Sequence, residues 1–365
     1  MAKKKKPRRE YGGGSYSYYE KMKRYRAYFV DPDGTRINEC FIEESDAKDW
    51  LALKKAEVIQ QEYITPSDDA LGPFSLYYLE TFCKTGLRAR TYEGYSSLLT
   101  HANPIAAIPM QELKPDDFVN LYASIDRSGS TKKKLHQLLK QILRQAVVEN
   151  KIKRNPMDGI PKAAVPKTGH KEIETFTPEE IALIFKTAEG NFYENLFLLF
   201  LVTGMRLSEG LGLRLTDFDS SLHRVHIRQT LHRSLDHGLI FEAPKSTASK
   251  RHISIPVEIS MKLARREHLH PTLLFSNTEG GPLMSDVAIR AWTKLLKEAG
   301  VPYRGLHTLR HTHATLLLKA GTPITEVSRR LGHARVSTTL DVYSHAIPAD
   351  DLAIVNTIAN IYSLR

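Results

Sequence analysis

The chain has 365 residues, enough for two or three domains, and 41% of them are hydrophobic, which suffices for a buried core. Its formal net charge of +11 predicts a polyanionic partner, most often nucleic acid, although a basic protein without such a partner has the same composition. No apolar run approaches the length of a membrane span, and the two cysteines, Cys40 and Cys83, lack metal-type or redox spacing. These features argue against a membrane-embedded protein and a disulfide scaffold, and they favour a reducing compartment.

The N-terminal residues 1–14 are predicted to form a disordered basic arm. They contain "MAKKKKPRRE" and then glycines, without the apolar stretch that a secretory signal requires. The arm is interpreted either as a phosphate-contacting segment or as a solubilising tail.

Residues 15–64 are predicted to form a small three-stranded antiparallel sheet followed by a helix. Aromatic and polar residues alternate, and "DPDG" at 31–34 marks a turn. Arg24, Arg26 and Arg36 stand among tyrosines on these strands, so the sheet suits a DNA groove. An ordinary solvated sheet face is the alternative.

Residues 70–155 are predicted to form a helical domain, because their apolar residues recur at three- and four-residue spacing. Lys132, Lys133 and Lys134 cluster near the start of one of these helices and are candidate DNA contacts. Residues 156–172 are rich in proline and lysine and are interpreted as a linker.

Residues 173–365 are predicted to form a mixed α+β domain, which makes the whole chain multi-domain and mainly α. Thr177 is expected to cap a helix that begins at Pro178, and Thr322 to cap one that begins at Pro323 and stops at Gly332. Between these helical parts, three alternating stretches in residues 223–257 are expected to form a small meander.

The stretch "GLHTLRHTHATLLLKAG" (305–321) carries an unusual group of basic side chains. His307 and Arg310 are three residues apart near a helix N-terminus, a spacing that makes a clamp for a phosphate or carboxylate. His307 and His311 have the spacing of metal ligands and His313 is near, but no acidic or cysteine ligand stands close by. Packing histidines are the third interpretation.

Three further motifs accompany this stretch: "TGMRLSEGLGL" with Arg206, "PKSTASKRHISIP" with Lys245, and "LGHARVSTTLDVYSHA" with His333 and Tyr343. Taken alone, the last segment is similar to a helix-turn-helix unit of a DNA-binding regulator. Taken together, the four motifs resemble the tyrosine recombinase family, the phage-type and conjugative-transposon integrases. The resemblance in motif runs from about Thr203 to Tyr343, and in layout it covers nearly the whole chain.

The resemblance implies a role for each motif residue. The catalytic set would be Arg206, Lys245, His307, Arg310, His333 and the nucleophile Tyr343, with Glu209 in a supporting role. Lys250 and Arg251 stand close to Lys245 and either could be the cation that matters, but the family lysine precedes a Ser or Thr, as Lys245 does. His311 and His313 are then interpreted as packing or supporting groups.

Tyrosine is a weak nucleophile and a phosphodiester is a poor electrophile, so fixed cations would have to stabilise the transition state. By the resemblance, Arg206 and Arg310 hold the phosphate, His307 assists proton transfer from Tyr343, His333 donates to the phosphate and Lys245 protonates the leaving 5′-oxygen. The product would be a 3′-phosphotyrosine, which rejoins without ATP, metal or other cofactor.

The implied function is site-specific recombination by the integrase of a mobile element. The implied partners are double-stranded DNA at core and arm-type sites, three further copies of the chain docked through the C-terminal tail, an excisionase and a DNA-bending host protein. The expected location is the bacterial cytoplasm, at the nucleoid. A type IB topoisomerase-like enzyme and a non-catalytic helix-turn-helix regulator remain as alternatives.

Overall fold

The computed structural model describes residues 13–32, 34–60, 63–169, 173–234, 238–244 and 247–346. Predictions on the basic arm before residue 13, on Lys245 and on the tail after residue 346 lie outside this described part. The chain divides into two compact units, Met1–His170 and Lys171–Arg365, and their boundary falls inside the linker predicted at 156–172. In the described ranges, no helix has both the length and the apolar character needed to cross a lipid bilayer.

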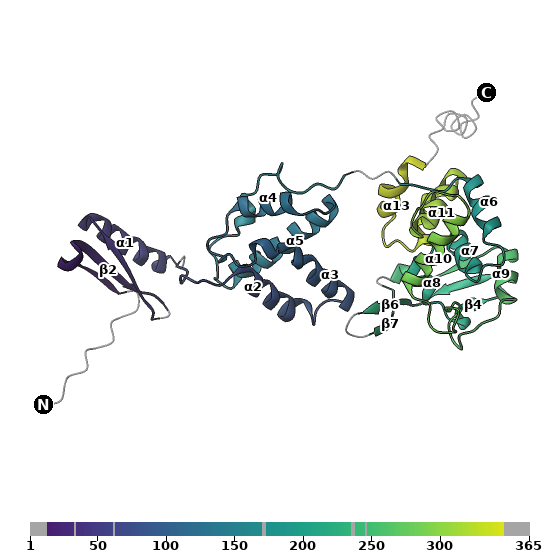
Figure 1. Cartoon of the computed structure of the whole chain (residues 1–365), viewed down its shortest axis with the longest axis horizontal. Coiled ribbons are helices and arrows are strands. Elements are labelled where there is room, and N and C mark those ends of the chain that lie inside the picture. Colours follow the sequence, from purple (N-terminus) through teal and green to yellow (C-terminus); the bar gives the residue numbers. More distant parts are fainter. Residues whose placement is uncertain are drawn as a thin grey trace, which may run out of the picture. The chain divides into compact units, whose positions relative to one another are not determined.

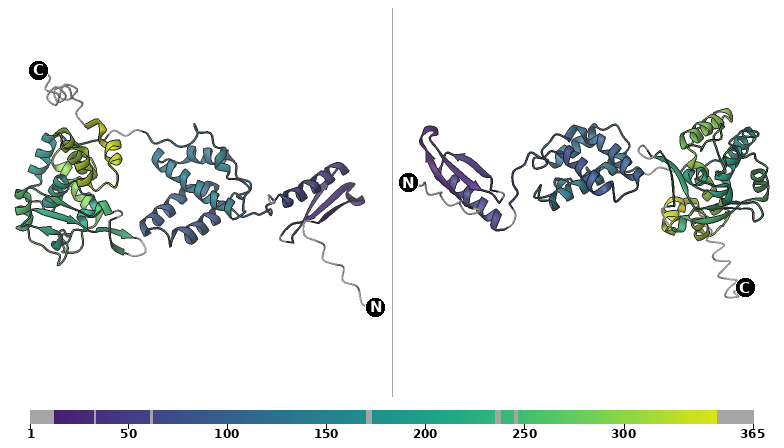
Figure 2. Two further views of the ribbon diagram at one scale, coloured as in Figure 1. Left: turned by 180° about the vertical axis from the view of Figure 1, so that it is seen from behind. Right: turned by 90° about the horizontal axis from the view of Figure 1, so that it is seen from below.

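The first unit begins with an antiparallel sheet and a helix, purple in Figure 1. The elements are β1 (Gly14–Tyr19), the turn η1 (Glu20–Met22), β2 (Arg24–Val30), β3 (Arg36–Phe41) and α1 (Glu44–Ile59), with strand order β1-β2-β3. Ala27 and Phe29 of β2 are fully buried, as is Ala47 of α1, and Figure 2 shows the helix along one face of the sheet. The predicted three-stranded sheet with its helix is confirmed, and its other face is open to solvent.

The rest of the first unit is helical, as predicted. Its elements are α2 (Leu71–Tyr78), the π-helical turn η2 (Leu79–Cys83), α3 (Ala89–Leu99), η3 (Thr100–Ile105), α4 (Pro115–Ser124), α5 (Gly129–Val148) and η4 (Pro156–Gly159). The apolar face of α5 supplies the buried Leu135, Leu139 and Ile142. Met157 and Ile160 are buried in the same core, so this helical part extends past residue 155.

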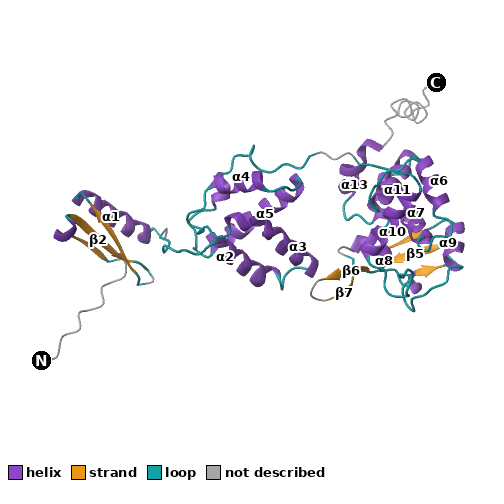
Figure 3. Cartoon of the chain, in the orientation of Figure 1, coloured by secondary structure: helices purple, strands orange, loops and turns teal. Residues whose placement is uncertain are grey.

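The second unit is mostly helical, with the strands as a minor part (Figure 3). Its helices are α6 (Pro178–Thr187), α7 (Glu194–Thr203), α8 (Leu207–Leu211), α9 (Val257–Ala264), α10 (Ser285–Glu298), α11 (His307–Lys319), α12 (Ile324–Leu331) and α13 (Val336–Tyr343), with short turns η5 (Leu215–Asp217), η6 (Thr247–Ser249) and η7 (Ser344–Ala346). The main core forms around the fully buried Trp292, whose ring contacts Phe176 and Phe197. The chain therefore has the predicted fold class, mainly α with small antiparallel sheets.

The strands of the second unit do not form one meander, so that expectation is wrong. They are β4 (Phe218–Asp219), β5 (Arg224–Ile227), β6 (Thr230–Ser234), β7 (Gly238–Glu242) and β8 (Arg251–Ser254). β8 pairs with β5, while β6 and β7 form a separate hairpin inserted between them in the sequence. Val225 and Ile253 face each other on β5 and β8 and are both buried, so burial selects this pairing over a sequential one.

The helix ends of the second unit test the predicted caps. Thr177 and Glu180 form the predicted capping box with each other's backbone amides, and Gly332 ends α12 with a φ of 69°. The start of α12 was predicted one residue too early, because Pro323 takes the cap position and the helix begins at Ile324.

Candidate active site

Arg206 is positioned by the sharp turn between α7 and α8. Gly204 ends α7 with a φ of 63°, and a Cβ there would lie 2.6 Å from the His313 ring, so only glycine fits. Arg206 then caps α8: its Nη1 donates to Glu209 Oε1 at 2.9 Å, and its backbone amide donates to Oε2 at 2.9 Å. Its side chain is 37% exposed, so the guanidinium can reach a ligand.

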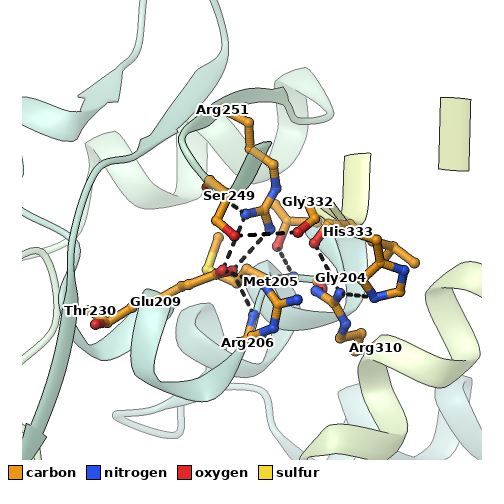
Figure 4. A network of polar contacts seen from close by, with 12 residues as sticks. Gly204, Met205, Arg206, Glu209, Thr230, Ser249, Arg251, Arg310, Gly332 and His333 are labelled. Carbon is orange, nitrogen blue, oxygen red and sulfur yellow. Dashed lines mark hydrogen bonds and ion pairs between the residues drawn. The ribbon is translucent and has the colours of Figure 1, made fainter. Parts of the chain in front are cut away.

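Glu209 is the buried centre of a polar network, shown in Figure 4. Besides Arg206, it accepts two hydrogen bonds from Arg251, at 3.2 and 2.9 Å. Burial alone would raise the pKa of this carboxyl, but Arg251 and Arg206 overcome that effect and hold the pKa below its usual value. Glu209 is therefore an ionised anchor that orients two guanidinium groups.

Arg310 lies buried inside α11 and fastens two turns of the backbone. Its Nη1 donates to the Gly204 carbonyl at 2.6 Å, and its Nη2 donates to the Leu331 carbonyl at 2.9 Å and to His333 Nε2 at 2.8 Å. A guanidinium has five N–H donors. The described partners of Arg310 use three of them, so two remain for a ligand. The three motifs containing Arg206, Arg310 and His333 thus meet at one place.

His333 follows the end of α12 and is held on both ring nitrogens. Since arginine can only donate, Nε2 must accept from Arg310, and Nδ1 must then carry the proton that it donates to Thr339 Oγ1 at 2.8 Å. Burial, with the charge of Arg310, lowers the pKa of His333 to about 4, so the ring is neutral at pH 7. Nε2 carries no proton in this arrangement, so it could donate to a ligand only after the ring gains a second proton or changes tautomer.

The cluster carries excess positive charge. Arg206, Arg251 and Arg310 surround the single carboxylate of Glu209, which leaves two positive charges without an ionic partner among the described residues. Burial and the neighbouring Arg206 lower the pKa of Arg310 to about 10. An anion would relieve both effects, because it would pair with charges that are already desolvated.

Tyr343 lies at the end of α13 with its side chain buried, 1% exposed. Burial raises the pKa of the phenol to about 12, against the opposing charges of Arg310 and Arg206. Its hydroxyl lies 2.8 Å from Nδ1 of His311. The motif resemblance implies proton transfer by His307, with His311 as a packing or supporting group; among the described contacts, His311 is the histidine that reaches the hydroxyl.

His307 and His313 have different surroundings on the same helix. His307 opens α11, is exposed, and stacks edge-on against His311 with ring centroids 4.7 Å apart. The protein around the ring removes part of its hydration, and this desolvation, together with the charges of His311, Arg310 and Arg206, lowers the pKa of His307 to about 4. His313 is buried and accepts from Arg330 Nε at 3.0 Å, so it is a packing residue, as interpreted.

The predicted lysine, Lys245, lies outside the described residues, whereas the two other candidate cations, Lys250 and Arg251, lie within them. Arg251 already donates to Glu209, to the Ser249 carbonyl and to the Arg330 carbonyl, so four of its five donors are in use. Lys250 is exposed at a recess of about 860 Å³ that Arg251, Arg330 and His333 also line. Arg251 is therefore held in place by these contacts, which leaves Lys245 and Lys250 as the candidates for the cation that the motif resemblance implies.

A metal site has no support in these positions. Among the residues that the structure describes, no three His, Cys, Asp or Glu side chains are grouped so that they could hold an ion. His311 uses Nδ1 for Tyr343, and Arg310 places a positive charge beside it.

The three predicted sheet arginines share the solvent-exposed face opposite α1. Arg24, Arg26 and Arg36 are exposed, and the register places Arg36 beside Val30 on the same face as Arg24 and Arg26. The Arg36 guanidinium stacks 3.8 Å from the centre of the Tyr28 ring. The structure brings these arginines together with an aromatic platform.

The lysines of α5 mark only part of a basic recess. Lys133 and Lys134 are exposed and Lys132 is half-buried. Lys133 lines a hollow of about 780 Å³ together with Lys140, Arg144 and Arg154. The sequence-based prediction missed Lys140 and Arg144, although their spacing of seven and eleven residues from Lys133 places them on one helical face.

Known proteins with related sequences and folds place this chain among integrases. Residues 174–349 match the family model described as "Phage integrase family". The "Tyrosine recombinase XerC-like" protein of Caldanaerobacter subterraneus subsp. tengcongensis is 28% identical, covering 85% of this chain and 90% of that protein. The "ICEBs1 integrase" of Bacillus subtilis is 28% identical over 66% of this chain and 68% of its own length.

Solved structures share the fold. The Tn1549 transposon integrase in complex with transposon right end DNA has a TM-score of 0.70 and 19% identity, covering 81% of this chain and all (100%) of that one. A lambda integrase tetramer bound to a Holliday junction has a TM-score of 0.60 and 16% identity, covering 91% of this chain and 95% of that one.

Proposed function

The chain belongs to the phage integrase family, the tyrosine recombinases, and on that premise we propose that it cuts and rejoins DNA through a covalent 3′-phosphotyrosine at Tyr343. It is a site-specific DNA recombinase of the integrase type. The step from family to mechanism depends on the residues of this chain.

One observation carries the proposal: the motif arginines converge on an unpaired positive site beside a buried tyrosine. Arg206 and Arg310 keep free N–H donors, whereas Arg251 is used in fixing Glu209. Donors that are fixed before the substrate arrives stabilise developing charge without a cost of reorganisation at the moment of reaction. A phosphodiester in this place would have its two non-bridging oxygens opposite Arg206 and Arg310.

In the proposed reaction, the Tyr343 oxygen attacks phosphorus and gives its proton to a histidine of α11, the bond to the 5′-oxygen breaks, and Lys245 protonates that 5′-oxygen. The His333 ring, once Nε2 carries a proton, donates to the phosphate, and His307 at the exposed N-terminus of α11 contacts the same phosphate. A 5′-hydroxyl of another strand then reverses the step, so the ester energy is kept and ATP is not needed.

The nucleophile is tested with Tyr343→Phe. Wild type is expected to form a covalent adduct with a nicked duplex that carries one end of the mobile element encoding the chain, seen as a shifted band on a denaturing gel. The variant should form none while binding the duplex normally, because only the hydroxyl is removed. Adducts in the variant would place the nucleophile elsewhere. A wild-type protein that binds the duplex but forms no adduct would favour the alternative of a non-catalytic DNA-binding regulator.

The leaving-group role of Lys245 has its own test. Lys245→Ala should slow cleavage of an ordinary duplex, and a duplex with sulfur at the 5′-bridging position should restore the rate, because a thiolate leaves without a proton. Lys250→Ala is the matched control and should cleave both duplexes like wild type. The reverse pattern would assign the role to Lys250.

DNA binding is proposed for the sheet face with Arg24, Arg26 and Arg36 and for the α5 surface with Lys132, Lys133 and Lys134. Removing one cation that pairs with a DNA phosphate should lower the slope of log affinity against log salt by about one. Alanine at all three sheet arginines should therefore flatten the salt dependence of binding to arm-type DNA and leave core-site cleavage intact. The proposed assembly on two core sites is a tetramer, testable by light scattering of the DNA-bound protein.

A further inference from the structure

The geometry points to His311 as the group that accepts the proton of Tyr343 during attack on the phosphate. This inference rests on the proposed function, since it needs Tyr343 to be the nucleophile. It moves the proton-transfer role from His307, the residue implied by the motif, to its neighbour one turn along the same helix.

The contact itself is direct. His311 Nδ1 and the Tyr343 hydroxyl are 2.8 Å apart, and their rings lie 5.6 Å apart between centroids. A group that removes a proton must lie within hydrogen-bond reach of it, and His311 does so before any DNA is bound. His307 makes no hydrogen bond to Tyr343 among the described contacts; it touches His311 edge-on instead.

The two neighbouring residues of α11 have separate partners. Arg310 donates to the Gly204 and Leu331 carbonyls and to His333, whereas His311 faces α13. His311 is half-buried and already hydrogen-bonded to the Tyr343 hydroxyl. Bulk water therefore does not have to accept the proton. One helix thus carries the phosphate-binding group and the proton acceptor at successive positions.

The proposed step moves one proton from the Tyr343 oxygen to Nδ1 of His311. His311 in its Nε2–H tautomer accepts the O–H hydrogen bond of Tyr343 at Nδ1. As the phenolic oxygen forms its bond to phosphorus and the bond from phosphorus to the 5′-oxygen breaks, the proton passes to Nδ1 and gives an imidazolium. On rejoining, the same imidazolium returns the proton to the tyrosine oxygen as it leaves.

Charge in the site controls when this transfer can happen. The groups facing His311 are His307 and Arg310 on α11 and Tyr343 on α13. Burial and the charge of Arg310 lower the pKa of His311, and burial raises that of Tyr343, so the proton stays on the phenol in the free protein. A bound phosphate anion would offset Arg310, and the phenol becomes strongly acidic only as it bonds to phosphorus, which couples deprotonation to attack.

The test separates a proton acceptor from a group that only positions the tyrosine. Asparagine can offer an oxygen near the place of Nδ1 but cannot take up a proton, so His311→Asn keeps the hydrogen bond and removes the base. On the nicked duplex, both His311→Asn and His311→Ala should form adducts about 100-fold more slowly than wild type. Wild type should also lose activity as pH falls through the lowered pKa of His311, and His311→Asn should lack that decline.

A second substrate bypasses the tyrosine. In the proposed mechanism, DNA with a 3′-phosphate esterified to p-nitrophenol should be joined to a 5′-hydroxyl without Tyr343, because p-nitrophenolate leaves without a proton. In a Tyr343→Phe background, adding His311→Asn should leave this joining unchanged, whereas adding His307→Asn, one turn away, should slow it through the phosphate.

Three results decide the matter. Adduct formation by His311→Asn at the wild-type rate would reduce His311 to a positioning residue and overturn the proposal. An equal decrease in adducts and in p-nitrophenyl joining would assign His311 to the phosphate or the fold, which also overturns it. Adducts in Tyr343→Phe alone would instead overturn the proposed nucleophile, so the two failures are distinguishable.

Discussion

The two sides of the proposed catalytic site are held in different ways. The phosphate side, Arg206, Glu209, Arg251 and Arg310, is tied by hydrogen bonds to the ends of α7 and α12 and to α8. The tyrosine side depends on side-chain hydrogen bonds to His311 and His333 and on a satellite core formed by Ala314, Leu318, Val327, Leu331, Tyr343 and Ala346. The main core of the unit is much larger than this satellite.

The difference separates two requirements of the reaction. Stabilising charge on a phosphate needs donors that do not move, and a network around a buried carboxylate provides them. Delivering a nucleophile only when DNA is in place suits an element held by few contacts, because few contacts must break. α11 joins the two sides, with Arg310 on one and His311 on the other.

The largest effect on adduct formation is expected from a substitution of Arg310, at the centre of the phosphate side. Arg310→Lys keeps the charge but removes the fork that holds the Gly204 and Leu331 carbonyls. We expect adduct formation to fall by about 10³-fold, near the upper end for one oxyanion donor. Adduct rate is measured beside circular dichroism and duplex binding, and a variant with near-normal rate would show that charge alone suffices.

Glu209→Gln tests the anchor. Two arginines would be deprived of their buried counter-charge, so the free energy of unfolding should fall by about 3 kcal/mol. Because the pKa of Glu209 is held low, its stabilising effect is present above the unfolded pKa and is lost as pH falls through the folded pKa. Urea unfolding of wild type and variant should therefore differ most near neutral pH and converge in acid; a constant difference would contradict the assignment of Glu209 as an ionised anchor.

The site and the sheets differ in how far the sequence could predict them. Local rules worked: alternation indicated the three-stranded sheet, and Thr177 with Glu180 indicated a capping box. Long-range pairing was missed, because β8 joins β5 past an inserted hairpin and because His311 meets a tyrosine 32 residues away. Helical periodicity places residues on a face but does not say which element lies opposite.

The tyrosine side should open more readily than the rest of its unit. α13 buries Thr339 and Tyr343 against the satellite core, whereas α7 buries Leu196, Phe197, Leu199 and Phe200 in the main one. In native-state hydrogen exchange, the amides of α13 should open at a free energy about 2 kcal/mol below those of α7. Equal protection of the two helices would mean that both sides of the site are equally fixed.

The smallest expected effect concerns Thr339, the residue of α13 that links the tyrosine side to the phosphate side. Its Oγ1 accepts from His333 Nδ1, and His333 Nε2 in turn accepts from Arg310. Thr339→Val removes one hydrogen bond worth about 1 kcal/mol, which corresponds to a roughly fivefold lower adduct rate. Nitrogen-15 spectra of the His333 ring supply the direct measurement: the Nδ1–H tautomer should dominate in wild type and decrease in population in the variant. A variant that keeps the tautomer would show that Arg310 alone sets it, and the two sides of the site would then be independent at this point.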